Sequence, residues 1–421
     1  MNADELRGST IVAMVLLGAA TGALTGLAAF ILVWSVTKLN IFVLDLWREN
    51  HIIIALTAAC GGFISGVIAK YVSSEVEGHG TDAAIRAVVE RSGFIPFRVP
   101  LAKLAATIAT VGLGGSGGLV GPMAHVGAGI SSFFSSIARV KPRIMRALAL
   151  SGIGSGVSAV LKAPLCGALA GLEILYRGPG LERGALIPSL VASFTSYLVI
   201  ASFMGFTPIL YRTISMSFAQ SCSPTVLGLA LLLGFLCGLL SRAYSTAFYG
   251  MRSLVDRVGI PRYLAPALGS FAAGLVAYVY PQVSGAGYIF FPRIVMGLYP
   301  TAMLLALSVS KLVTNCLTVG SRGSGGVVAP AIFIGASFGA FVYKALHLAS
   351  IIGIPPSMGA MMGVVGILSG VCRIPLAAIA LAVEATGCPA LIAPSILVAV
   401  TSYLVAGPRA TIYRSQREGS S

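Results

Sequence analysis

The fold of this chain is decided by a short apolar string that occurs twice, as GSGGLVGP at residues 115–122 and as GSGGVVAP at residues 323–330. The two copies lie 323 − 115 = 208 positions apart in a chain of 421 residues. A string that returns almost unchanged, both times in apolar surroundings, indicates an internal repeat.

Further landmarks repeat at nearly the same spacing. They are Gly78-His79-Gly80 with Gly285-Ala286-Gly287, Arg86 with Arg293, and Ala163-Pro164-Leu165 with Ile374-Pro375-Leu376. Ordered landmarks at one spacing are not expected by chance. We therefore interpret the chain as two homologous transmembrane repeats, residues 1–215 and 216–421.

The composition indicates that lipid solvates the chain. Hydrophobic residues make up 57% of the sequence and charged residues 10%, and the mean hydropathy is +0.93, whereas a soluble domain carries about 25% charged residues. Runs without charge that could span a bilayer as a helix of about 20 residues are residues 8–37, 184–211, 213–241, 263–292 and 385–408. Because further spans follow the first run, that run is not a cleavable signal peptide. The sequence predicts an all-α, multi-pass membrane protein.

The net charge of +15 does not indicate a nucleic-acid partner, because the basic residues are scattered between apolar segments. We interpret them as loop charges that orient the protein in the cell membrane and contact anionic lipid. The arginine-bearing C-terminus is expected in the cytoplasm. The seven cysteines form no CxxC pair and have no histidine at ligand spacing, so neither a metal site, a disulfide framework nor a cofactor is predicted.

The repeated strings predict helices that are interrupted within the membrane. Glycines permit an open turn, and Pro122 fits the first turn of a following helix, where its missing N–H costs nothing. Pro330 repeats this arrangement. Such a helix start presents unpaired N–H groups and partial positive charge, which attract an anion without any charged side chain. Two related halves with two such starts at one point predict a shared anion site, as in inverted-repeat transporters.

Several motifs together resemble the CLC family of chloride channels and anion/proton antiporters. They are GHGTD at residues 78–82, GLVGP at 118–122, KAPL at 162–165 followed by Glu173, GVVAP at 326–330 and TIY at 411–413. The likeness runs in order along nearly the whole chain. It implies a CLC-like inverted repeat of tilted and interrupted helices, and a homodimer with one pathway for chloride or a similar small anion in each subunit.

Carried over by position, the resemblance implies an anion held by backbone amides near both strings, with His79 in the place of the family's central serine and the Tyr413 hydroxyl at the inner end. The implied anion-binding residues are His79, Gly118, Leu119, Val120, Gly121, Val327, Val328, Ala329 and Tyr413. Protonated imidazole would tighten anion binding below about pH 6.5. The alternative is that His79 faces a vestibule or bonds a carbonyl without binding the anion.

Two departures from the family bear on mechanism. Val120 stands where the family has its gating glutamate, and Ile174 stands where it has the inner proton-transfer glutamate. Neither side chain can carry a proton. We therefore expect passive conduction that is not coupled to protons. The alternative is an anion/proton antiporter that uses non-standard proton-transfer residues.

Glu173 and Glu384 occupy equivalent repeat positions in apolar segments, where a carboxylate is costly and usually functional. Their symmetry favours a structural role, in which each accepts hydrogen bonds from helix starts or pairs with a basic residue such as Lys162 or Arg373. A proton-transfer role for Glu173 is the alternative.

A different class of function is an intramembrane serine protease. Residues 114–117 fit the GxSG pattern of rhomboid proteases, with Ser116 as nucleophile and His79, His125 or His347 as base. That interpretation leaves the second string unexplained. The duplication therefore favours a transport protein over an enzyme.

Overall fold

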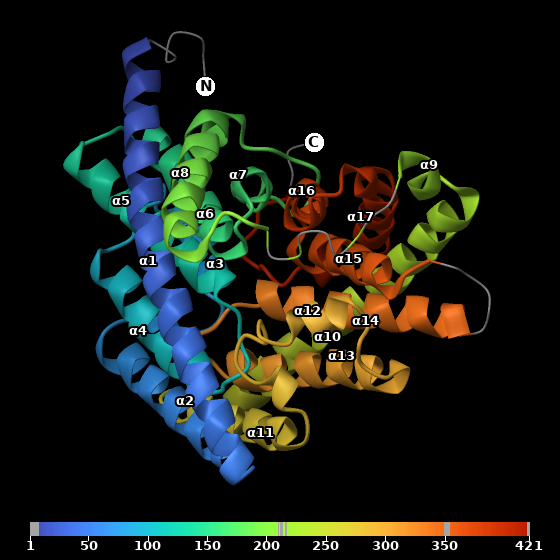
Figure 1. The fold of residues 1–421 in the computed structure, drawn as a ribbon. Coiled ribbons are helices and arrows are strands. Elements are labelled where there is room, and N and C mark those ends of the chain that lie inside the picture. The colour runs from blue at the N-terminus through green and yellow to red at the C-terminus, as the bar shows by residue number, and fades with distance from the viewer. Residues whose placement is uncertain (1–7, 209, 211–213, 215–216, 349–353, 419–421) are drawn as a thin grey trace.

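The computed structural model describes residues 8–208, 210, 214, 217–348 and 354–418, and these are almost entirely helical (Figure 1). The first half forms α1 (Gly8–Glu49), α2 (Ile53–Tyr71), α3 (Thr81–Glu90), α4 (Arg98–Gly112), α5 (Val120–Ile137), α6 (Pro142–Leu161), α7 (Pro164–Glu173) and α8 (Leu186–Met204). The second half forms α9 (Phe218–Ser221), α10 (Pro224–Val258), α11 (Ala265–Val279), α12 (Phe291–Val295), α13 (Thr301–Asn315), α14 (Val328–Leu348), α15 (Pro356–Ile367), α16 (Pro375–Thr386) and α17 (Ile392–Ala406).

Within the described residues, eight helical stretches are long and apolar enough to cross a bilayer. The prediction of an all-α, multi-pass membrane protein is confirmed. The predicted span at residues 263–292 is shorter than its charge-free run, because α11 ends at Val279. Beyond it, Gly285 and Gly287 take left-handed backbone conformations, with φ of +55° and +78°, which a continuing α-helix does not allow.

The helices of the two halves follow one another in the same order. Apart from the short α9, the elements from α1 to α8 match those from α10 to α17 one by one, and both α7 and α16 begin at a proline. Figure 1 shows α1 and α2 along one edge of the molecule and α13 and α14 on the other side of it. This order favours two repeats, whose expected boundary between residues 215 and 216 lies outside the described residues.

Glycines allow the helices to approach closely. A Cβ added at Gly22 of α1 would lie 2.3 Å from the Ala192 carbonyl oxygen of α8. Between α5 and α6, a Cβ at Gly127 would lie 2.1 Å from the Gly152 carbonyl oxygen. Such contacts pack helix backbones directly against each other, and they fix α5 in the buried centre of the protein.

Candidate functional site

The two glycine strings meet at the centre of the structure. The Gly118 N–H donates to the Gly326 carbonyl oxygen at 2.8 Å, and the Gly326 N–H donates back to the Gly118 carbonyl oxygen at 2.6 Å, as an isolated antiparallel bridge. A Cβ at Gly118 would lie only 2.8 Å from the Cβ of Ala329. Because α5 and α14 begin just after this bridge, the structure brings the two predicted helix starts to one point.

The first turns that follow the bridge present unpaired backbone donors. Five of these amides donate no hydrogen bond to another described residue; they belong to Val120, Gly121, Val327, Val328 and Ala329. An α-helix cannot satisfy its first amides internally, and the positive helix end adds to their attraction for an anion. The Gly118 amide differs, because the bridge already occupies it.

The Leu119 amide faces Tyr288, a residue outside the predicted anion-binding set. The Tyr288 hydroxyl lies beside this amide without a hydrogen bond of normal length to it, and the hydroxyl oxygen is buried. Tyr288 directly follows the repeated string at residues 285–287, which was the available sequence signal. The hydroxyl adds a polar group beside the cluster of amides.

Two buried lysines were also missed. The Lys103 ammonium donates to the Gly78 carbonyl oxygen at 2.7 Å, and the Lys311 ammonium donates to the Gly285 carbonyl oxygen at 2.8 Å. Both side chains are fully buried. Their separation of 311 − 103 = 208 positions equals that of the strings, so the repeat spacing could have revealed them.

Each of these carbonyl oxygens also joins the two halves. The Gly78 oxygen accepts a bond from the Gly325 N–H at 3.3 Å, and the Gly285 oxygen accepts one from the Gly117 N–H at 3.2 Å. A lysine and loop of one half therefore hold the glycine string of the other half. The two ammonium groups also place positive charge near the unpaired amides, where it favours an anion.

His79 and Tyr413 lie together beside the cluster. Their ring centroids are 5.4 Å apart, and the His79 carbonyl oxygen packs so closely on Gly121 that a Cβ there would lie 2.3 Å from it. The Tyr413 hydroxyl donates to the Cys372 sulfur at 3.6 Å. The structure thus brings His79, Gly121 and Tyr413 together, as the resemblance implied.

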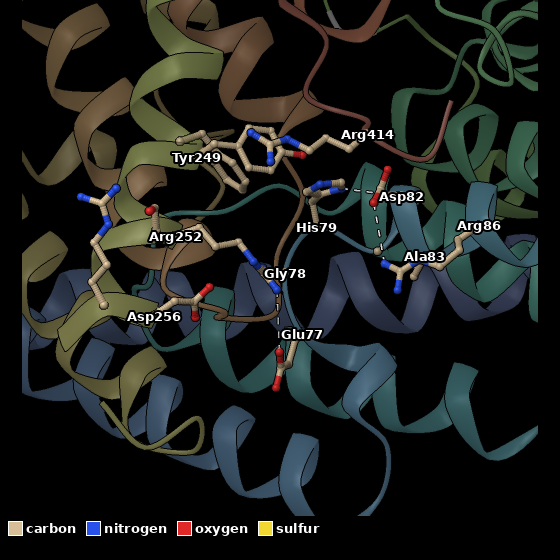
Figure 2. Close-up of a pocket in the computed structure, with 14 residues that line it drawn as sticks. Glu77, Gly78, His79, Asp82, Ala83, Arg86, Tyr249, Arg252, Asp256 and Arg414 are labelled. Carbon is tan, nitrogen blue, oxygen red and sulfur yellow. Dashed lines mark hydrogen bonds and ion pairs between the residues drawn. The ribbon is translucent and has the colours of Figure 1, made fainter. Parts of the chain in front are cut away.

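His79 borders a cavity of 550 Å³, which we call the histidine cavity (Figure 2). Its charged lining consists of Arg86, Arg252, Arg257, Arg414, Glu77, Asp82 and Asp256. The His79 Nδ1 accepts a bond from the Asp82 N–H at 3.5 Å, which leaves Nε2 as the donor of the neutral ring. His79 lies in a loop outside the spanning helices, and burial lowers its pKa to about 4. The expected protonation therefore moves from about pH 6.5 to about pH 4.

No carboxylate stands in the first turn of α5. Val120 and Ile174 are both buried, and the Ile174 carbonyl oxygen accepts a bond from Gln416 at 3.0 Å. Val120 therefore presents a hydrocarbon side chain at the start of α5. It cannot compete with an anion for the helix end.

Glu173 and Glu384 cap each other's helices. The Glu173 carboxylate accepts bonds from the Leu376 and Ala377 amides at the start of α16, at 3.0 and 2.9 Å. The Glu384 carboxylate accepts bonds from the Leu165 and Cys166 amides at the start of α7, both at 2.8 Å. The predicted bonding of these glutamates to helix starts is confirmed.

The serine of the first string has a structural partner. The Ser116 hydroxyl accepts a hydrogen bond from the Thr314 hydroxyl at 3.0 Å. Among the described contacts it donates no hydrogen bond to an imidazole nitrogen, which is the contact that a serine nucleophile needs with its base. Across the part of the chain that the structure describes, no group of three or more His, Cys, Asp or Glu side chains could hold a metal ion.

Comparison with known proteins identifies the family. The family model described as voltage gated chloride channel matches residues 61–407, which is most of the chain. The chain belongs to the CLC family. Its CLC relatives include a putative chloride channel protein ClcB-like of Ralstonia nicotianae, 26% identical over 83% of this chain and 82% of the relative. The resemblance seen in the sequence is thereby confirmed.

Other CLC relatives differ in what their names state. A chloride/fluoride channel protein of Pseudomonas syringae is 27% identical over 95% of this chain and 86% of its own length. An H(+)/Cl(-) exchange transporter ClcA of Vibrio parahaemolyticus is 28% identical over 86% of this chain and 78% of its own length. Both relatives support CLC-type anion transport for this chain. One is named a channel and the other an exchange transporter, so their names do not decide between these two modes.

Solved structures show the same fold. A slow cyanobacterial Cl-/H+ antiporter has a TM-score of 0.82 at 20% identity, covering 93% of this chain and 94% of the antiporter. A CLC-type fluoride/proton antiporter has a TM-score of 0.81 at 21% identity, with 100% of both chains covered. These likenesses establish the CLC architecture of this chain.

Proposed function

We propose that this CLC protein conducts chloride or a similar small monovalent anion passively, without coupling to protons. The anion is held by the amides of residues 119–121 and 327–329, with Gly118 fixing their approach through its bridge to Gly326. His79 provides a donor on the inner side, and the Tyr413 hydroxyl provides a second one by turning from the Cys372 sulfur to the anion. The protein acts as a homodimer in the cell membrane, with one pathway in each subunit and its C-terminus in the cytoplasm.

The observation that carries this proposal is the start of α5, where unpaired amides stand beside Val120 instead of a carboxylate. A carboxylate at this place could occupy the helix end in the absence of an anion, and it could carry a proton when the anion enters. Valine can do neither. The buried ammonium groups of Lys103 and Lys311 add attraction for the anion without introducing a negative group.

The proposal is tested by reconstituting the protein in liposomes and recording chloride and proton movement together. We expect chloride efflux without accompanying proton flux, and a reversal potential at the chloride equilibrium potential. Proton movement in a fixed ratio to chloride would instead identify an anion/proton antiporter, the activity named for the Vibrio relative.

Val120→Glu sharpens this test. The new carboxylate is expected to occupy the helix start and slow chloride efflux at pH 7.5, and acidification is expected to restore the flux by neutralising it. Val120→Gln is the matched control, because it has nearly the same size without a charge. Equal inhibition by glutamine at every pH would mean that side-chain volume, not negative charge, blocks the pathway.

A further inference from the structure

A second cavity, separate from the amide cluster, is lined by arginines alone among charged residues. It has a volume of 540 Å³ and is bounded by Arg177, Arg409 and Arg414 together with Tyr249 and hydroxyl-bearing residues. No aspartate or glutamate belongs to its described lining. We call it the arginine cavity. The histidine cavity differs, because its four arginines are accompanied by three carboxylates.

The three arginines come from distant parts of the chain. Arg177 follows α7, whereas Arg409 and Arg414 lie in the segment after α17. The Arg177 guanidinium donates to the Arg414 carbonyl oxygen, and its Nε is buried without a partner among the described residues. Arg414 also borders the histidine cavity with its carboxylates, but no carboxylate lines the arginine cavity itself. Guanidinium groups that line one cavity repel each other, so the arrangement favours a bound anion.

A fourth arginine adds positive charge behind the cavity wall. The Arg373 Nε donates to the Arg177 carbonyl oxygen at 2.9 Å, and its guanidinium lies over the Tyr403 ring, 3.2 Å from the centroid. The side chain is nearly buried. The contacts of Arg373 thus place it directly against the loop that carries Arg177.

We propose that the arginine cavity binds a phosphate-bearing anion. Guanidinium groups match the oxygens of phosphate with paired hydrogen bonds, and three of them suit a multivalent anion better than a single chloride. The cavity is large enough for a pyrophosphate or a phosphorylated headgroup. Basic pockets between membrane helices bind lipid headgroups by the same chemistry, so the phosphate belongs either to a soluble compound or to a lipid.

The position of the cavity links this ligand to the inner end of the anion pathway. The Arg414 guanidinium stacks on the Tyr249 ring, 3.4 Å from the centroid, and both residues also line the histidine cavity (Figure 2). The Tyr249 hydroxyl donates to the Ile412 carbonyl oxygen at 2.6 Å, directly before Tyr413. A ligand that engages Arg414 would therefore hold the segment that positions Tyr413.

The test measures binding to the purified full-length protein, so its outcome is independent of how the protein conducts anions. In neutral detergent near physiological salt, calorimetric titration with pyrophosphate is expected to show one saturable site per subunit. Arg409→Gln and Arg414→Gln should each lower the affinity for pyrophosphate about tenfold, because each removes a charge-assisted contact. Both side chains are exposed, so these variants should fold.

Arg183→Gln is the matched control, since Arg183 is an exposed arginine in the same loop as Arg177 but outside the cavity. A second arm compares thermal unfolding in micelles that contain phosphatidic acid or phosphatidylcholine. Pyrophosphate binding would identify a soluble phosphate compound as sufficient. Stabilisation by phosphatidic acid alone, lost in Arg409→Gln, would identify a lipid headgroup. Binding in neither arm, or an equal loss in Arg183→Gln, would overturn the proposal.

Discussion

The reciprocal glutamate caps provide a sharp test of what these buried carboxylates do. Each carboxylate accepts two amide hydrogen bonds, at 3.0 and 2.9 Å for Glu173 and at 2.8 Å twice for Glu384. Glutamine has the shape of glutamate but only one acceptor oxygen. Its side-chain NH2 group would face one of the two backbone N–H groups, and two donors cannot bond each other. The substitution therefore removes one bond to a charged group and weakens the other.

The cost follows from the bonds that are lost. A hydrogen bond to a charged group contributes about 1.5 to 3 kcal/mol, and a negative charge at a helix start contributes up to about 1 kcal/mol more. We expect Glu173→Gln and Glu384→Gln each to destabilise the protein by about 3 kcal/mol. The loss should be somewhat larger for Glu173, which is the more buried of the two.

The assay is the apparent melting temperature of the purified variants in detergent, measured beside chloride and proton flux in liposomes. Because Glu173 and Glu384 occupy equivalent positions in the two repeats, each variant serves as the control for the other. Similar losses of melting temperature with similar effects on flux would agree with mutual capping. If Glu173→Gln left the melting temperature unchanged and altered proton flux while Glu384→Gln had no effect, Glu173 would be a proton-transfer residue and the capping account would be wrong.

Two further outcomes follow from the site. Because burial lowers the pKa of His79 to about 4, its ring stays neutral from pH 8 to pH 5.5 and gains a charge only below that range. Chloride binding, measured by calorimetry, should therefore be flat over that range and tighten near pH 4, and His79→Ala should lack the increase; a His79-dependent step near pH 6.5 would contradict this. Lys311→Met should weaken chloride binding, since it removes a buried positive charge whose ammonium bonds the Gly285 carbonyl oxygen beside the glycine string. Lys344→Met is its control, because Lys344 also bonds two carbonyl oxygens but lies near the far end of α14; equal losses would show that the charge of Lys311 does not act on the anion.

Local rules predicted the helix starts correctly. Pro122 and Pro330 each lie at the third position of a helix, α5 and α14, as expected of a residue that needs no N–H partner in the first turn. These features depend on residues near one another in sequence, so a single sequence reveals them.

Long-range polar contacts were beyond such rules. Lys103 donates to the Val76 carbonyl oxygen, 27 residues away, and a carbonyl acceptor leaves no mark on the side-chain sequence. The bridge between the Gly118 amide and Gly326 also joins backbone groups, so the side-chain sequence does not reveal it either. The arginine cavity depends on Arg177 meeting a segment more than 230 residues later, which no local pattern indicates. The repeat spacing carried information over such distances and extended to the two lysines, and the family resemblance brought His79 and Tyr413 together.

The exchange of contacts between the halves explains why the site needs the whole chain. Each helix start that carries unpaired amides is held by groups of both halves, through the Gly118–Gly326 bridge and through the Gly78 and Gly285 carbonyl oxygens. Within one half alone, these carbonyl oxygens and amides would lose partners while still being surrounded by apolar side chains, and buried groups of this kind are costly when unpaired. Duplication therefore supplies more than a second set of amides, because each half provides the polar partners that allow the other half to interrupt its helices inside the membrane.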